Sequence, residues 1–293
     1  MKLLRAATLT VSDLARSCQL YSEYFDYSIV EEGRVSDDIA VSWGAPKSAG
    51  QPYAIMQPSS KAEIYLRFIE QPPVEGFRAL RSYGWNAIEI CVTDVLAANE
   101  RMLKSPFEII GPPREIDGLP AIYPMQVKGP DEEIVYLTQI RDDLPAFDLP
   151  RAETLIDKLF ILVMGCRDMD EGNRWLAEHC GLEMGRDMEI VYTMLAKAYE
   201  TDPEELHRIS TMVHGRDVFL EIDQYPDAAT DRPRHKDMLV PGCAIGTLWH
   251  PEFDSLKGPW ITPPVNRDGP VYQGKRAGTM AGPDGVLVEM VEG

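Results

Sequence analysis

Two carboxylates in otherwise apolar strands are the residues of this chain best suited to chemistry. Glu289 is the only charged residue in the run 286–290, and Glu221 lies between Leu220 and Ile222. A carboxylate in a buried strand is costly unless it is paired, hydrogen-bonded, metal-bound or faces a wet cavity. If Glu221 and Glu289 share one cavity, burial and like-charge repulsion raise one pKa, and the pair can act as catalytic acid and base. The alternative is that Glu221 faces solvent on a half-exposed strand.

The strand of Glu289 has a counterpart in the first half of the chain. The turn Gly282-Pro283-Asp284 precedes it, and the same turn occurs at Gly129-Pro130-Asp131. Tyr136 then stands where Glu289 does, 153 residues earlier (289 − 136). Pro and Asp-Gly are typical of tight turns, so both segments are predicted to be a turn that leads into a strand.

The strand of Glu221 is repeated in the same way. Residues 65–72 match residues 219–226, with Arg67 at the position of Glu221. The matches occur in the same order in both halves, which indicates a tandem duplication.

The local elements around these residues recur as modules. Each of three capping pairs follows a predicted strand and precedes a predicted helix: Ser12-Asp13, Thr93-Asp94 and Arg167-Asp168. A fourth module is predicted from Ala244 onward, and further strand and helix segments are expected at 40–43 and 199–207, respectively. The sequence therefore predicts an α+β protein of four βαβββ modules. We expect an N-terminal domain at 1–141, a Pro- and Asp-rich linker at 142–153 and a C-terminal domain at 154–293.

Composition restricts the partners. The 293 residues carry a net charge of −18 without a basic run, which argues against nucleic acid. The five cysteines show no CxxC spacing, which favours a reducing compartment. No signal peptide or long apolar run is apparent, so we expect a cytoplasmic protein without a membrane span, a monomer or a homodimer, that binds a small molecule.

Three further side chains are candidates on weaker grounds. His214 and His250 lie in or at the ends of predicted strands and could assist proton transfer, although a lone His is more often structural. Trp249 could line a pocket for a flat ligand, although core packing explains it equally well.

The module pattern resembles the vicinal oxygen chelate superfamily, which includes glyoxalase I, bleomycin-resistance proteins, methylmalonyl-CoA epimerase and extradiol dioxygenases. The resemblance is carried by the segment Thr10-Val11-Ser12-Asp13-Leu14 with Tyr21 and Phe25, and by the two Gly-Pro-Asp turns. It implies that two modules form a cupped mixed sheet around one ligand cavity. Four modules in two pairs then make two cups, a tandem glyoxalase-like fold.

Metal-using relatives place a His on the first strand of a module and a Glu near its last strand. The corresponding positions in the first cup are Ala6, Arg67, Asn86 and Tyr136. In the second cup they are Ile161, Glu221, Ala244 and Glu289. Neither cup offers a full ligand set, so the resemblance implies no cofactor, with a divalent metal in the C-terminal cup as an alternative.

The function we predict is metal-independent acid/base chemistry of the lyase or isomerase type on a small aromatic or carbonyl compound. Glu289 and Glu221 are the predicted acid and base, with His250 or His214 assisting. In the other cup, Arg67 and Tyr136 could bind a substrate or form a purely structural pair. The alternatives are a non-catalytic binding or drug-resistance protein, and a metal-dependent glyoxalase or dioxygenase.

Overall fold

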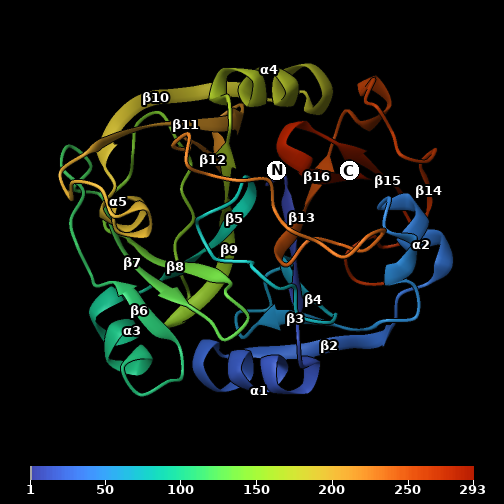
Figure 1. The fold of residues 1–293 in the computed structure, drawn as a ribbon, viewed down its shortest axis with the longest axis horizontal. Coiled ribbons are helices and arrows are strands. Elements are labelled where there is room, and N and C mark those ends of the chain that lie inside the picture. Colours follow the sequence, from blue (N-terminus) through green and yellow to red (C-terminus); the bar gives the residue numbers. More distant parts are fainter. Residues whose placement is uncertain (1) are drawn as a thin grey trace.

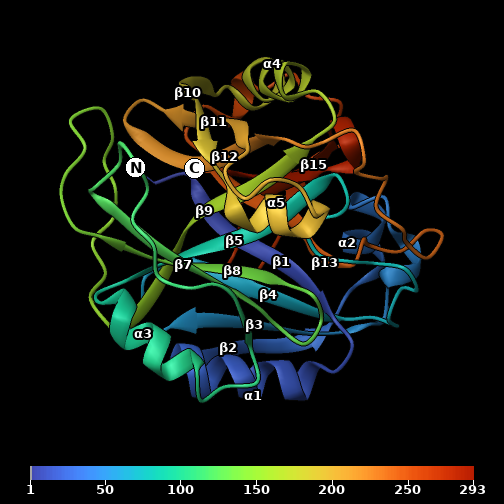
Figure 2. The same ribbon diagram turned by 60° about the vertical axis from the view of Figure 1, so that its left-hand side comes forward.

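The computed structural model describes residues 2–293 and contains two eight-stranded mixed sheets (Figures 1 and 2). Module 1 comprises β1 (Leu4–Val11), α1 (Leu14–Phe25), β2 (Tyr27–Arg34), α2 (Asp37–Ser42), β3 (Pro52–Pro58) and β4 (Tyr65–Glu70). Module 2 comprises β5 (Gly84–Val92), α3 (Val95–Met102), β6 (Glu108–Gly111), β7 (Ile122–Lys128) and β8 (Ile134–Ile140).

The second half repeats this order of elements. Module 3 comprises β9 (Ile156–Cys166), α4 (Met169–Cys180), β10 (Glu183–Val191), α5 (Thr193–Tyr199), β11 (Leu206–His214) and β12 (Asp217–Gln224). Module 4 comprises β13 (Gly242–His250), a short 3₁₀ turn (Phe253–Ser255) in place of the helix, β14 (Val265–Asn266), β15 (Arg276–Ala281) and β16 (Leu287–Glu292). The predicted tandem arrangement of α+β modules is confirmed.

The pairing of the modules differs from expectation. One sheet has the order β14-β15-β16-β13-β1-β4-β3-β2, and the other has β10-β11-β12-β9-β5-β8-β7-β6. Module 1 therefore pairs with module 4, and module 2 with module 3, so the expectation that each half closes its own cup is wrong. The reason is that the first strands pair across the halves, β1 antiparallel to β13 and β5 antiparallel to β9. We call the two sheets the 1–4 cup and the 2–3 cup.

Alternation along the strands separates a shared core from the inside of each cup. In β5, Ile88 and Ile90 point into the large core between the two sheets, while Ala87 and Cys91 belong to a separate apolar cluster inside the 2–3 cup. Glu89 lies between the two core residues, so it points into the cup. In the central strands of both sheets, one face thus packs into the shared core and the other faces the inside of a cup.

The Gly-Pro-Asp turns hold the modules together. The Asp131 carboxylate accepts hydrogen bonds from the backbone N–H of Ser12 and the hydroxyl of Ser17, at the start of α1. Asp284 accepts from the backbone N–H of Arg167, at the start of α4. Each turn therefore links its own module to the chain just before a helix of another module, and the caps of those helices are Asp13 and Asp168.

Two inserted helices cover the cups. Residues 40–43, expected as a strand, lie at the end of α2, because Ser36 caps a helix and accepts from the N–H of Ile39. The helix expected at 199–207 lies earlier, at α5, and residues 206–214 form β11. Both helices follow the second strand of their module, and Figure 1 shows α5 and α2 on opposite sides of the molecule. Among residues 2–293, no helix is long and apolar enough to cross a bilayer.

Candidate active site

Equivalent positions in the two cups are defined by the strand registers. In the 1–4 cup, Thr8 pairs with Arg67 between β1 and β4, and Thr247 pairs with Glu289 between β13 and β16. In the 2–3 cup, Glu89 pairs with Tyr136, and Val163 pairs with Glu221. The structure therefore separates Glu289 from Glu221, which the sequence interpretation had placed in one C-terminal cup. It brings Arg67 to Glu289 and Tyr136 to Glu221.

Glu289 is fully engaged at the centre of the 1–4 cup. Its Oε2 accepts from Arg67 Nη2 at 3.0 Å and from Thr247 Oγ1 at 2.9 Å. Its Oε1 accepts from Trp43 Nε1 at 2.8 Å and from Tyr272 Oη at 2.9 Å. Each carboxylate oxygen thus has two donors, and the side chain is 1% exposed.

The same contacts determine the charge of Glu289. Burial by itself raises the pKa of this carboxyl, but the Arg67 charge and the hydrogen bonds from Trp43, Thr247 and Tyr272 lower it below its ordinary value. The raised pKa expected from the sequence is therefore wrong, because the cation that pairs with Glu289 comes from the other half of the chain. A saturated, permanently ionised carboxylate is poorly suited to proton transfer.

Arg67 is equally well satisfied. Its Nε donates to Thr8 Oγ1 at 2.9 Å, its Nη1 donates to Tyr272 Oη at 2.6 Å, and its guanidinium lies 4.6 Å from the centre of the Trp43 ring. Burial by itself lowers the pKa of Arg67, but the interactions with Glu289 and Tyr272 outweigh it, so the pKa of Arg67 lies above its ordinary value. These contacts favour the structural interpretation of Arg67.

The 2–3 cup has a different chemical character. Glu221 accepts a hydrogen bond from Tyr192 Oη at 3.3 Å, and the Tyr192 hydroxyl also contacts that of Tyr136. Asp223, two residues further along β12 and on the same face, hydrogen-bonds Glu221. Across the sheet, Glu89 accepts from Thr138 Oγ1. Three carboxyls and two phenols therefore share the inside of one cup.

The pKa values in this cup are all shifted toward the protonated acids. Burial, assisted by the Glu221 charge, raises the pKa of Glu89 to about 8. Burial raises the pKa of Glu221 to about 7, against hydrogen bonds from Tyr192 and Asp223. Burial and the Glu221 charge raise the pKa of Asp223 well above its ordinary value. Acids with pKa values close to neutrality are typical of proton-transfer sites.

Exposure distinguishes the members of this acid cluster, which we define as Glu89, Glu221 and Asp223. Asp223 is 1% exposed and its Oδ1 has no hydrogen-bond partner, whereas Glu221 is half-buried. The Nε2 atom of His207, a neighbour of Tyr192, is also buried without a partner. Buried polar atoms without hydrogen-bond partners are uncommon in folded proteins.

Helix α5 is the cover of the acid cluster. Tyr192 immediately precedes it, and Met194 and Leu195 pack into the same apolar cluster as Ile161 and Val163 of β9. In the 1–4 cup, α2 is the equivalent insertion and is followed by Trp43. Each insertion thus delivers one aromatic hydrogen-bond donor to the carboxylate on the last strand of a module.

The other predicted residues lie away from the acid cluster. The rings of His214 and His250 are 5.5 Å apart, but His250 Nδ1 accepts from the backbone N–H of Glu252, and its Nε2 faces Gly181 at the end of α4. Neither is placed to assist Glu221 or Glu289. The Arg5 guanidinium lies over Trp249, 4.1 Å from the centre of the Trp249 ring.

Sequence reasoning missed several members of both sites. Glu89 carried the signal used for Glu289, a single carboxylate between apolar strand residues, here Ile88 and Ile90. Asp223 follows Glu221 at the period of a strand and could have been found in the same way. No sequence signal identifies Tyr192 or Trp43, because both reach the cups from inserted helices.

The residues of the two cups do not fit a divalent metal. In the 1–4 cup, Arg67 is paired with Glu289, and the strand registers place Thr8 and Thr247 beside them in place of the expected Ala6 and Ala244. In the 2–3 cup, the matching positions are Glu89, Tyr136, Val163 and Glu221, and Asn86 instead binds Arg232. No group of three His, Cys, Asp or Glu able to hold a metal occurs among residues 2–293.

Comparison with solved structures defines the fold of the whole chain. Glyoxalase I from Zea mays is 15% identical and aligns over 100% of this chain and 92% of its own, with a TM-score of 0.62. A Bacillus subtilis protein proposed to be a dioxygenase is 13% identical and aligns over 99% of this chain and 85% of its own, with a TM-score of 0.61. No protein-family model matches the sequence, and no curated protein matches it significantly.

The chain therefore has the tandem glyoxalase-like fold, matched over its full length by glyoxalase I from Zea mays. At these identities the likeness concerns the fold, and the chemistry has to be argued from the two cups.

Proposed function

We propose that the 2–3 cup is the active site of an enzyme that moves protons on a small carbonyl compound, in an isomerase or lyase reaction. The observation that carries this proposal is the acid cluster, in which Glu221 has a pKa of about 7 and Glu89 a pKa of about 8. Near neutral pH the first can accept a proton while the second still holds one.

Each residue then has a defined role. The Glu221 carboxylate removes a proton from the carbon next to the substrate carbonyl, and Glu89 donates its proton to the carbonyl oxygen. The product of this step is a neutral enol, with Glu221 protonated and Glu89 ionised. With a hydroxyketone this enol is an enediol, and the isomerisation is completed when Glu221 returns its proton to the former carbonyl carbon and the hydroxyl on the other carbon gives its proton to Glu89. Asp223 and Tyr192 stabilise the Glu221 carboxylate by hydrogen bonding.

The cup also restricts the substrate. Burial and the charges of other carboxyls raise the pKa values of the acid cluster, and no Arg or Lys contributes to lowering them. An anionic substrate would be repelled, so a neutral or cationic compound is favoured. Tyr136 and Tyr192 offer aromatic surface, which suits a flat or aromatic carbonyl compound.

The test is proton exchange in D₂O. Neutral aromatic hydroxyketones are incubated with the protein, and loss of the carbon-bound proton is followed by ¹H NMR. We expect exchange that survives dialysis against a chelator and is reduced at least 100-fold by Glu221→Gln. Glu189→Gln, an exposed carboxylate on β10 of the same module, is the matched control and should exchange normally. Exchange that disappears on chelation, or that is unaffected by Glu221→Gln, would overturn the proposal.

A second candidate function is non-catalytic binding of an organic cation in the same cup. It is favoured by the same excess of carboxyls without a paired cation. Binding of a cation that releases protons from the acid cluster, measured by calorimetry in buffers of different ionisation enthalpy, together with no exchange on any carbonyl compound, would favour it over the enzyme.

A further inference from the structure

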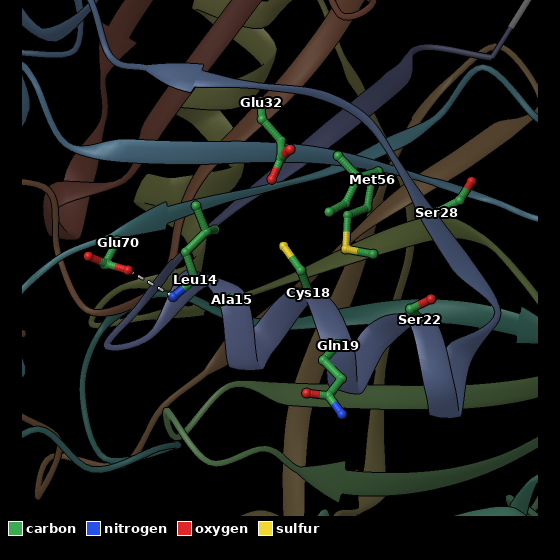
Figure 3. Close-up of a pocket in the computed structure, with 10 residues that line it drawn as sticks. Leu14, Ala15, Cys18, Gln19, Ser22, Ser28, Glu32, Met56 and Glu70 are labelled. Carbon is green, nitrogen blue, oxygen red and sulfur yellow. Dashed lines mark hydrogen bonds between the residues drawn. The ribbon is translucent and has the colours of Figure 1, made fainter.

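One open cavity of the surface lies outside both cups. A cavity of about 610 Å³ runs between α1 and β2, on the helix-bearing face of the sheet of the 1–4 cup (Figure 3). Its size is in the range of sites for drug-sized ligands. Neither the acid cluster nor the Arg67–Glu289 pair contributes to its lining. We call this cavity the outer groove.

The floor and walls of the outer groove are apolar. Met56 and Cys18 are buried at its base, and Leu14 and Ala15 of α1 form one wall. Ile29 of β2 forms the opposite wall and leaves 43% of its surface exposed. A large apolar side chain beside an open cavity can bury further surface against a ligand.

One end of the outer groove is acidic. Glu70 lines it at the start of α1, where it accepts from the N–H of Leu14 at 3.0 Å, and Glu32 faces it from β2 (Figure 3). Glu32 is close enough to Cys18 that, together with burial, it raises the pKa of that thiol to about 11. The opposite end carries the hydroxyls of Ser22 and Ser28 (Figure 3).

The two ends of the outer groove differ in charge. No Lys or Arg lines it, and the Lys61 ammonium lies 3.4 Å from Ser28 Oγ, at the end away from Glu70. A ligand with one positive charge is therefore attracted to the carboxylate end only.

We propose that the outer groove binds a small organic cation with an apolar body, a second site independent of the cup chemistry. The ammonium group lies between Glu32 and Glu70, and the apolar body covers Met56 and Ile29. Cation binding follows from the two carboxylates, and selectivity for an amphiphile follows from the apolar floor.

The experiment uses three probes that share a naphthyl body and carry a positive, a neutral or a negative polar group: naphthylethylammonium, naphthylethanol and naphthylacetate. Binding to the full chain is measured by calorimetry at pH 7. We expect the ammonium compound to bind more tightly than the alcohol, and the carboxylate not to bind. Glu32→Gln should weaken ammonium binding about two- to fivefold, the size expected for a partly exposed ion pair. Glu23→Gln, an exposed carboxylate of α1 outside the groove, should leave it unchanged.

A second variant tests whether the ammonium probe binds in the outer groove. Ala15→Trp fills the cavity from the exposed side of α1 and should weaken ammonium binding more than tenfold. Leu96→Trp at the equivalent position of α3 is the control, and both variants are checked by thermal melting. Equal binding of the three probes, no binding of the ammonium compound, or binding that survives Ala15→Trp would overturn the proposal.

Discussion

Replacement of Arg67 by Met tests whether the 1–4 cup is held together by a buried ion pair. Met keeps the apolar stem of the side chain and removes the donors to Glu289, Thr8 and Tyr272. Breaking a buried pair by removing one partner typically costs about 3–5 kcal/mol, because the remaining charge is left desolvated. We expect a loss of this size in the free energy of unfolding at pH 8.

The loss should depend on pH in a defined direction. In the native protein the pKa of Glu289 is lowered, so its contribution to stability is present above its unfolded pKa and is lost as pH falls. In Arg67→Met the unpaired carboxyl is governed by burial, which raises its pKa, so the variant loses stability as pH rises above about 4.5. The difference between variant and native protein is therefore largest at pH 8 and smallest near pH 4.

Urea denaturation at both pH values, followed by circular dichroism, measures the effect. The double variant Arg67→Met with Glu289→Gln should recover at least about 1 kcal/mol, since it removes the unpaired charge. Arg101→Met, which removes a surface ion pair with Asp26, is the control and should cost at most about 1 kcal/mol. A loss below about 1 kcal/mol for Arg67→Met that does not change with pH would refute the reasoning.

Three further predictions concern the cups and the turns. Glu89→Gln should stabilise the protein by roughly 2–5 kcal/mol at pH 9 and little at pH 4. The reason is that the pKa of Glu89 is raised in the native protein, so native stability falls as pH rises from the pKa of the unfolded state through about 8. Equal urea midpoints of variant and native protein at pH 9 would contradict this. Exchange activity should rise with pH through about 7 and fall above about 8, as Glu221 loses its proton and then Glu89 does, and a pH-independent rate would contradict the assignment. Asp284→Ala should lower stability by about 1 kcal/mol through the lost hydrogen bond to the backbone N–H of Arg167, measured by urea unfolding, with no change in exchange.

The module architecture was predictable because its signals are local. Asp13, Asp94 and Asp168 cap helices as expected, and the Gly-Pro-Asp turns precede strands. The pairing of modules was not predictable, because β1 and β5 carry similar apolar patterns that fit several partner strands equally well. That choice decides which carboxylate meets which cation, so an error in pairing became an error in the site.

The candidate site was predictable in part for the same reason. Glu221 was selected as a carboxylate that faces a cup, and the structure places it beside Tyr192 and near Tyr136. The repeat did not predict the proximity of Glu221 and Tyr136. Glu289 was selected on equally good local grounds but is neutralised by Arg67, 222 residues away in sequence. A local pattern reports that a carboxylate is buried and cannot report which charge neutralises it.

The most direct measurement of the central claim is a ¹³C NMR titration of the glutamate carboxyl groups, with resonances assigned by Glu→Gln variants. The structure predicts that Glu221 titrates near 7, that Glu89 titrates near 8, and that Glu289 remains ionised below its ordinary pKa. Ordinary values for Glu221 and Glu89 combined with a near-neutral value for Glu289 would contradict the account and move the acid/base site to the 1–4 cup.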